Sequence, residues 1–192
     1  MSKTHVLVFG GTGPAGINLL RELLHRNHPT IAYVRNRSKI PEDLAANSLL
    51  EIIEAPLTSL PALSAALART TSIVSLLGPQ LNTPSTPSPI PAFYTSLFAL
   101  MRQHSVKRIL ASTTVSVVDT SLDGWSPVRA LMIAAIRLIS PPSYRTVLDI
   151  AKVFETDAAG LDWTVYRVAM IPGGSDEKSW REDRERGGVY EN

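Results

Sequence analysis

The sequence predicts an α/β fold with three layers, in which helices cover both faces of a doubly wound parallel sheet. Apolar runs of strand length alternate with stretches of helical period along the chain. Several strand-like runs are apolar at successive positions, as expected when both faces of a sheet are buried. The first run leads into closely spaced glycines and then into a helix-like segment. Together these observations favour a parallel sheet whose strands are joined by crossover helices.

Strands and helices are expected in strict alternation. Short apolar and β-branched runs predict strands at 5–10, 30–35, 49–55, 72–78, 108–113 and 163–168. Apolar residues that recur three or four positions apart predict helices at about 14–27, 41–47, 60–69, 91–104, 127–139 and 145–158.

Two segments interrupt this alternation. Residues 78–93 carry prolines at 79, 84, 87, 89 and 91, which are incompatible with a helix interior or a central strand. Because this segment follows the fourth strand, we expect it at the carboxyl edge of the sheet. Residues 175–192 carry charges of both signs without an apolar period, which predicts a polar C-terminal tail that is solvated or partly disordered. A chain of 192 residues is the size of one domain, which we place at 1–174.

Composition excludes several classes of function. The chain is 44% hydrophobic and 19% charged, as in a soluble globular protein, and its net charge of +2 with no basic run does not indicate nucleic-acid binding. The absence of cysteine excludes disulfides and thiol catalysis, and the four histidines lack the spacing of a metal site, so no metal is expected. No secretory signal and no apolar stretch of roughly 20 residues is present, so we expect a cytoplasmic protein without a membrane span.

The glycine cluster has the spacing Gly10-x-x-Gly13-x-x-Gly16 between the first strand and the first helix. In this context it predicts a dinucleotide site. Gly10 would permit the tight turn, Gly13 would let a pyrophosphate approach the backbone, and Gly16 would let the helix pack closely. The N–H groups from Thr12 to Ala15 would face the phosphates, with Pro14 in the first helical turn, where its missing N–H is not needed. The alternative is a purely structural turn.

The residues after the second strand bear on the choice of dinucleotide. A carboxylate about 20 residues past the glycines usually binds the ribose 2′-hydroxyl of NAD, whereas an arginine accommodates the 2′-phosphate of NADP. This chain has Arg35 at the strand end, followed by Arg37 and Ser38, and it has no acid there. The pattern favours NADP(H) over NAD(H), with a solvated basic turn as the alternative.

Five segments resemble the atypical short-chain dehydrogenases, most closely the NmrA-like, NAD(P)H-binding type that includes flavin and biliverdin-IXβ reductases. They read VLVFGGTGPAGINLLRELLHRNH, AYVRNRSK, IVSLLGP, RILASTTVSV and GLDWTVYRVAMI, and the resemblance covers residues 4 to 174. It implies a Rossmann fold in which Leu76, Leu77 and Gly78 line the adenosine half of the cofactor. It also implies that Ser112 and Thr113 face the nicotinamide and that residues from Val168 to Ile171 flank its carboxamide.

Three departures from the family pattern stand out. Many relatives carry a GD pair after the third strand, where this chain has Ala55-Pro56-Leu57, and many read RP where this chain has Arg167-Val168. Relatives also commonly continue with one more strand and helix. The tail at 175–192 is therefore expected to belong to an incomplete substrate lobe.

The standard catalytic pair of this class is absent, because none of the five tyrosines is followed four residues later by lysine. A looser candidate set is Ser112 at the end of the fifth strand, Tyr144 just after Pro141-Pro142 at the entrance to the helix expected at 145–158, and Lys152 two turns beyond Tyr144. For Lys152 a solvated pair with Asp149 explains the residue equally well.

The leading function is an NADP(H)-dependent reductase that acts on a small apolar or conjugated substrate. The proline-rich segment 79–91 and the apolar stretch VRALMIAAIRLI are expected to border the substrate, although the same stretch is also compatible with core or with a homodimer face. Two other functions stay open: a non-catalytic NmrA-like sensor that signals through a protein partner, and an isomerase or dehydratase on the same fold.

Overall fold

The computed structural model describes residues 3–79, 88–119, 123–168 and 174–185, and it confirms the predicted three-layer α/β fold. The sheet has six parallel strands in the order β3-β2-β1-β4-β5-β6. Their bounds are β1 His5–Phe9, β2 Thr30–Val34, β3 Leu50–Glu54, β4 Thr70–Ser75, β5 Arg108–Thr114 and β6 Asp162–Val168. The strand order reverses between β1 and β4, and ligands of such sheets bind at the carboxyl edge beside this point.

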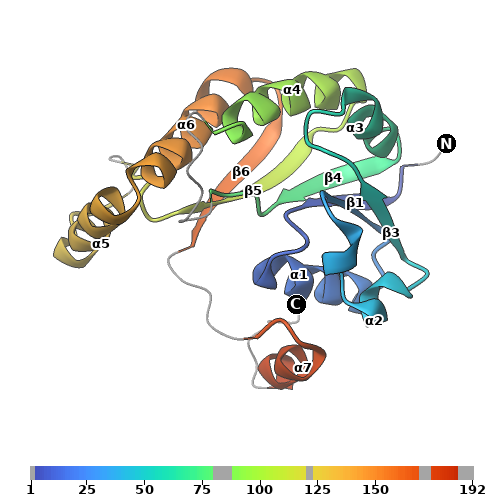
Figure 1. The fold of residues 1–192 in the computed structure, drawn as a ribbon. Helices are drawn as coiled ribbons and strands as arrows, with labels where there is room; N and C mark the ends of the chain where they lie inside the picture. Colours follow the sequence, from blue (N-terminus) through green and yellow to red (C-terminus); the bar gives the residue numbers. More distant parts are fainter. Residues whose placement is uncertain (1–2, 80–87, 120–122, 169–173, 186–192) are drawn as a thin grey trace.

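Helices cover both faces of the sheet, as predicted (Figure 1). On one face lie α3 (Leu60–Leu67), α4 (Ile90–Gln103) and α6 (Pro141–Asp157), and on the other lie α1 (Pro14–His25) and the short α2 (Glu42–Ala45). A 3₁₀ turn, η1 (Arg37–Lys39), follows β2. The helix α5 (Pro127–Ile139) projects from the end of the sheet that holds β5 and β6.

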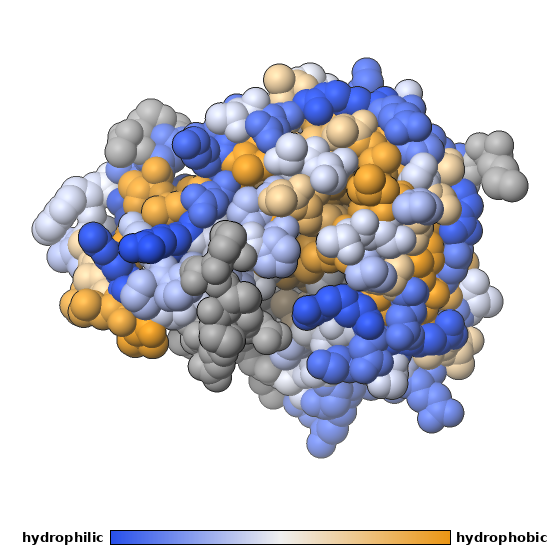
Figure 2. Space-filling model, turned by 45° about the horizontal axis from the view of Figure 1, so that its top comes forward, coloured by the Kyte–Doolittle hydropathy of each residue, from blue (hydrophilic) through white to orange (hydrophobic). Residues whose placement is uncertain are grey.

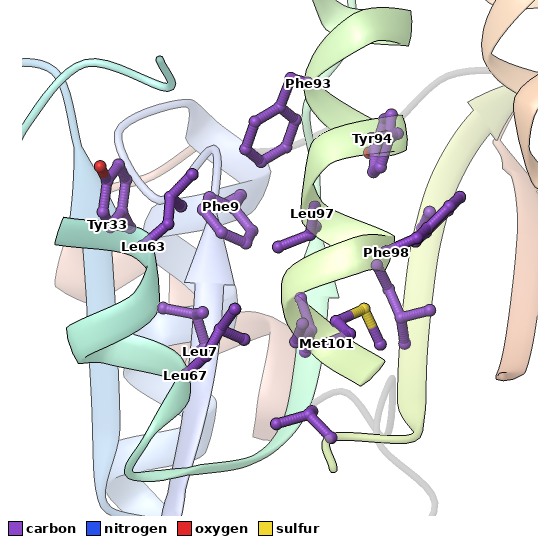
Figure 3. Packing of buried hydrophobic residues seen from close by; sticks show 14 of the residues in the cluster. Leu7, Phe9, Tyr33, Leu63, Leu67, Phe93, Tyr94, Leu97, Phe98 and Met101 are labelled. Carbon is purple, nitrogen blue, oxygen red and sulfur yellow. The ribbon is translucent and has the colours of Figure 1, made fainter. Parts of the chain in front are cut away.

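The core divides into two clusters because side chains alternate across the sheet. On β1, Leu7 and Phe9 pack with α3 and α4, whereas Val8 packs with α1 on the opposite face. The largest buried side chains of the first cluster are aromatic, and Phe9 and Phe93 meet edge to face with their centroids 5.1 Å apart (Figure 3). This packing fixes the carboxyl end of β1, from which the glycine loop departs.

The tail differs from the sequence prediction, because residues Glu177–Glu185 form a helix, α7. Asp176 accepts a hydrogen bond from the Ser179 N–H at 2.9 Å at its start. Two tertiary contacts hold α7 against α1: Arg184 donates to both carboxylate oxygens of Glu22 at 2.7 and 2.9 Å, and the Trp180 ring lies 5.6 Å from that of His25. The sequence analysis did not predict this helix, and none of the α7 residues is buried.

One helix has an unusual environment. No residue of α5 is buried, and its Val128, Leu131, Leu138 and Ile139 side chains are exposed together with the preceding Trp125. Figure 2 shows hydrophobic residues gathered at this end of the molecule. Among the described residues, no helix is both long enough and apolar enough to cross a membrane.

Candidate functional site

The glycine loop lies between β1 and α1 and has two positions where only glycine fits. Gly10 has a φ of +78°, and a Cβ there would lie 2.8 Å from the backbone carbonyl carbon of Leu76, the residue that follows β4. A Cβ on Gly16 would lie 2.2 Å from the carbonyl oxygen of Gly10, so α1 packs directly on the loop. The roles predicted for these two glycines, a tight turn and close helix packing, match this geometry.

Gly13 occupies a different environment in the same loop. Its N–H donates to the Gly10 carbonyl at 3.2 Å and its carbonyl accepts from the Ile17 N–H at 2.8 Å, which starts α1. A Cβ on Gly13 would have a single neighbour, the Gly10 oxygen at 3.7 Å, so the space beside this residue is open. Pro14 opens the helix and no acidic residue stands in its first turn. An open approach to a helix N-terminus that has no acidic residue in its first turn fits a diphosphate.

A cavity of ≈ 230 Å³ adjoins the ends of β2, β3 and β4. It is lined by Arg35, Leu57, Leu77 and Gly78, and by residues at the starts of α4 and α6. The guanidinium-bearing side chain of Arg35 is exposed immediately after the last residue of β2. Apolar walls beside a cationic group suit an adenosine whose ribose carries a phosphate.

The segment Ala55-Pro56-Leu57, which differs from the GD pair of many relatives, forms part of the wall of this cavity. The Tyr33 hydroxyl donates to the Pro56 carbonyl at 3.0 Å, and the Ala55 N–H donates to the Val34 carbonyl at 3.0 Å. These bonds hold the chain after β3 so that Leu57 forms part of the cavity wall. An apolar contact therefore stands where many relatives place an aspartate. Burial raises the pKa of the Tyr33 hydroxyl, which keeps it protonated as a donor.

The basic turn after β2 contacts a carboxylate of the neighbouring strand that the sequence analysis missed. Glu54, the last residue of β3, accepts a hydrogen bond from the Arg37 N–H at 3.2 Å. The Ser38 hydroxyl donates to Asn36 Oδ1 at 2.7 Å and so helps to shape η1. Val34, the last residue of β2, pairs with Glu54 of β3. The pairing of the two strands could therefore have predicted a carboxylate beside the turn, whereas the residues that follow β2 could not.

A larger cavity, of ≈ 530 Å³, opens at the end of β5 and shares Leu77, Gly78, Pro79 and Ser143 with the smaller one. Its polar wall consists of β5 and the residues after it, Ser112, Thr113, Thr114, Val115 and Ser116. Its apolar wall is formed by Met132, Ala135 and Ile136 of α5 and by Val147 and Ile150 of α6. Because the two cavities share lining residues, they form one groove along the carboxyl edge of the sheet.

The predicted catalytic residues are only partly brought together. Ser112 lines the larger cavity and is hydrogen-bonded to Tyr166, its neighbour across β5 and β6, and burial raises the pKa of Tyr166. The α6 residues that face this cavity are Ser143, Val147 and Ile150, whereas Tyr144 is half-buried and Lys152 is exposed, and neither lines it. The structure therefore does not join Tyr144 and Lys152 to Ser112.

The other cofactor candidates fall at the same edge of the sheet. Leu76 follows β4 and donates its N–H to Phe9 at 2.9 Å, and Thr113 and Ser112 share the wall of the larger cavity. Val168 ends β6 opposite Thr114. Ile171 lies outside the described residues. Within the described part of the chain, no three His, Asp or Glu side chains gather in a way that would hold a metal ion.

A family described as NAD(P)H-binding matches residues 10–187, a range that holds the glycine loop, the arginine turn and both cavities. The chain belongs to this family. The comparison with curated proteins found no match.

Solved structures share the fold of this NAD(P)H-binding chain at low sequence identity. A wide-type short-chain dehydrogenase/reductase from Veillonella parvula, in complex with NADP, is 14% identical at a TM-score of 0.62, covering 85% of this chain and 68% of that one. ChuY, an anaerobillin reductase from Escherichia coli O157:H7, is 17% identical at 0.59, with 85% and 72% covered. The negative transcriptional regulator NmrA, in complex with NADP, is 17% identical at 0.60, with 86% and 45% covered. At these identities the likeness establishes the fold alone.

Proposed function

We propose that the protein is an NADP(H)-dependent oxidoreductase that exchanges a hydride with a small apolar or conjugated substrate. The observation that carries this proposal is the larger cavity, which is mostly apolar and continuous with the dinucleotide groove. A reductase needs such a water-poor space beside the reactive end of its cofactor. Fold alone does not provide it, because the same scaffold hosts many functions.

The residues of the chain would divide the work of holding and orienting the reactants. The N–H groups of the glycine loop and the α1 N-terminus would bind the diphosphate, and Arg35 would bind the 2′-phosphate and so favour NADP(H). The bound nicotinamide supplies the hydride chemistry. The walls from α5 and α6 would exclude water and orient the substrate.

Proton supply is the step at which the protein departs from standard short-chain enzymes. Ser112 is the candidate that reaches the cavity, with Tyr166 behind it as a hydrogen-bond partner. A conjugated acceptor such as a quinone takes its proton readily from solvent after hydride addition. Proximity and orientation would therefore carry most of the catalysis without the tyrosine–lysine pair, and Ser112 would add a smaller contribution as proton donor.

A dinucleotide-sensing regulator is the second candidate, and the exposed apolar face of α5 favours it. Val128, Leu131, Leu138 and Ile139 present apolar surface to solvent, the kind of surface that marks protein interaction sites. A sensor would bind the dinucleotide and pass the signal through this surface to a protein partner, without turnover.

Binding and turnover are tested separately. Calorimetric titration with NADPH, NADH and NADP⁺ is expected to show tighter binding of NADPH than of NADH, and Arg35→Ala is expected to remove that preference. Spectrophotometric consumption of NADPH with quinone and flavin acceptors then separates the two functions. Consumption would exclude a purely non-catalytic sensor, whereas tight binding without consumption of any acceptor would favour it. No binding of either dinucleotide would refute both.

A further inference from the structure

The apolar side chains on the exposed side of α5 recur with the spacing of a helix-packing seam. Val128, Leu131, Ala135 and Leu138 follow one another at intervals of three, four and three residues, and all four are exposed. Residues with this spacing form one stripe along a helix, as the a and d positions of a coiled coil do. Val128, Leu131 and Leu138 are 68%, 73% and 82% exposed, so most of each side chain is not packed against its own molecule. We call this stripe the α5 seam.

The α5 seam is complementary to a second copy of itself. Its four positions are symmetric about residue 133, so two antiparallel α5 helices place Val128 of one copy opposite Leu138 of the other, and Leu131 opposite Ala135. Each larger side chain then meets a smaller one, which lets the two rows interdigitate. A pairing of this kind is closed by a two-fold axis and uses the same surface on both copies.

The charges of α5 do not oppose this pairing. The helix contains no acidic residue, and at 100° per residue its two arginines, Arg129 and Arg137, lie about 140° from the middle of the seam, one on each side. Arg129 is also held by Asp123 and by the Gly124 carbonyl. Two copies therefore meet along an uncharged stripe, whereas the carboxylates of an acidic partner would find no cation on it.

The exposed apolar area suits a weak, reversible dimer. Ile139, at the end of α5, and Trp125, which precedes the helix, flank the seam and are 76% and 85% exposed. Full burial removes about 100 Å² for a Val, Leu or Ile side chain and about 200 Å² for a tryptophan, so the seam and its flanking residues offer about 500 Å² per copy. A standard stable interface buries about 800 Å² per partner. We therefore expect association at micromolar concentrations.

We propose that α5 is the contact surface for a second copy of this chain, with the two α5 helices antiparallel along the α5 seam. Figure 1 shows α5 projecting from the end of the sheet, where a partner helix can lie along it. Ala135 also lines the larger cavity, so Leu131 of the second copy lies at the rim of that cavity. The seam is defined without any cofactor, and the inference therefore does not depend on the proposed function.

Sedimentation velocity of the whole chain, from about 1 to about 200 µM, tests the association. We expect a monomer–dimer equilibrium with a Kd in the micromolar range that high salt does not weaken, because salt does not screen an apolar contact. Leu131→Glu places a charge at the centre of the seam and should raise the Kd by about tenfold or more. Ala130→Glu adds the same charge at an exposed position about 120° from the seam, so this matched control should keep the Kd within about twofold.

Three results of this experiment would overturn the proposal. The first is a chain that stays monomeric over the whole range of concentration. The second is a dimer that both variants weaken equally, since the contact would then lie elsewhere. The third is a monomer that cosediments with vesicles containing phosphatidylserine and loses this binding in Leu131→Glu, because the exposed side of α5 would then contact a lipid surface.

Disulfide crosslinking tests the antiparallel orientation. The chain has no cysteine, so Val128→Cys and Leu138→Cys each carry a single thiol. In the antiparallel pair these two thiols face each other, whereas two copies of Val128→Cys hold theirs about 15 Å apart along the helix axis, beyond the reach of a disulfide. On oxidation with copper phenanthroline we expect a crosslinked dimer from the mixture of both variants and none from either variant alone. Crosslinking of Val128→Cys with itself, or no crosslinking of the mixture at concentrations where the dimer forms, would overturn the assignment.

Discussion

Substitution of Gly13 by alanine separates cofactor binding from folding. The backbone at Gly13 has φ −80° and ψ 163°, which alanine adopts without strain, and the added Cβ would meet protein only at 3.7 Å. We therefore expect the free energy of unfolding to change by less than about 1 kcal/mol. The methyl group would occupy the open space through which the diphosphate reaches the loop. Loss of one or two charge-assisted hydrogen bonds, each about 1.5–3 kcal/mol, weakens NADPH binding by about tenfold or more.

Gly16→Ala is the contrasting variant. Its Cβ would lie 2.2 Å from the Gly10 oxygen and 2.7 Å from the Gly11 Cα, both below the 3.0 Å that real Cβ atoms respect. Backbone must move, so this variant should lose stability by about 1–3 kcal/mol as well as affinity. Urea unfolding and NADPH titration of both variants provide the measurement. If Gly13→Ala binds NADPH within twofold of the original protein, the diphosphate does not pass over Gly13 and the reasoning fails.

Three further predictions follow from contacts in and around the groove. Glu54→Gln removes a negative charge from the η1 turn while its oxygen still accepts from Arg37, and titration should show NADPH binding strengthened by about twofold to fivefold with NADH little changed. Ser112→Ala should lower kcat for a reducible acceptor by about tenfold or more at unchanged NADPH affinity. Ser96→Ala, at an exposed serine, is the control. An unchanged kcat in Ser112→Ala would show that solvent, and not Ser112, supplies the proton. The hydrogen bond from Arg167 holds the pKa of Asp123 below its usual range, so the ion pairs of Asp123 with Arg167 of β6 and Arg129 of α5 are fully present above the normal aspartate pKa. These ion pairs are lost as the pH falls through the lowered pKa of the folded protein. Asp123→Asn at neutral pH should therefore make α5 as sensitive to protease as acid does, and unchanged cleavage of the variant would contradict this.

The fold was predictable because its signals are local. Each strand of the sheet is a short apolar run, and the three glycines of the loop lie within six positions of one another. Both features can therefore be predicted from residues that are close in sequence. The docking of α7 was not predictable in this way. Its helix follows from local ion pairs such as Glu177 with Arg181, but its contact with Glu22 joins residues 162 positions apart.

The candidate site shows the same division between local and non-local information. The sequence places Ser112 at a strand end and Lys152 on the helix predicted at 145–158, but it does not determine which side of that helix faces the strand. The helix begins at Pro141, four residues earlier than expected, and Ser143 faces the cavity. Nine residues further on, at about 100° per residue, Lys152 lies on the opposite side. The rotational phase of α6 therefore decides which candidate reaches the site.

The groove changes character along its length, and this change bears on the chemistry that it supports. At the β2 end it offers the exposed cation of Arg35, whereas at the β5 end its described lining is hydroxyl-bearing and apolar without any charge. A molecule that is anionic at one end and neutral at the other, such as a dinucleotide with its nicotinamide beside an apolar substrate, matches this gradient. No lysine lines this end among the residues that the structure describes, so on the proposed function we expect proton transfer from the protein to contribute little. Substrates whose reduced form is a stabilised anion depend least on such a donor, so on the proposed function we expect conjugated carbonyl compounds to react faster than unconjugated ones.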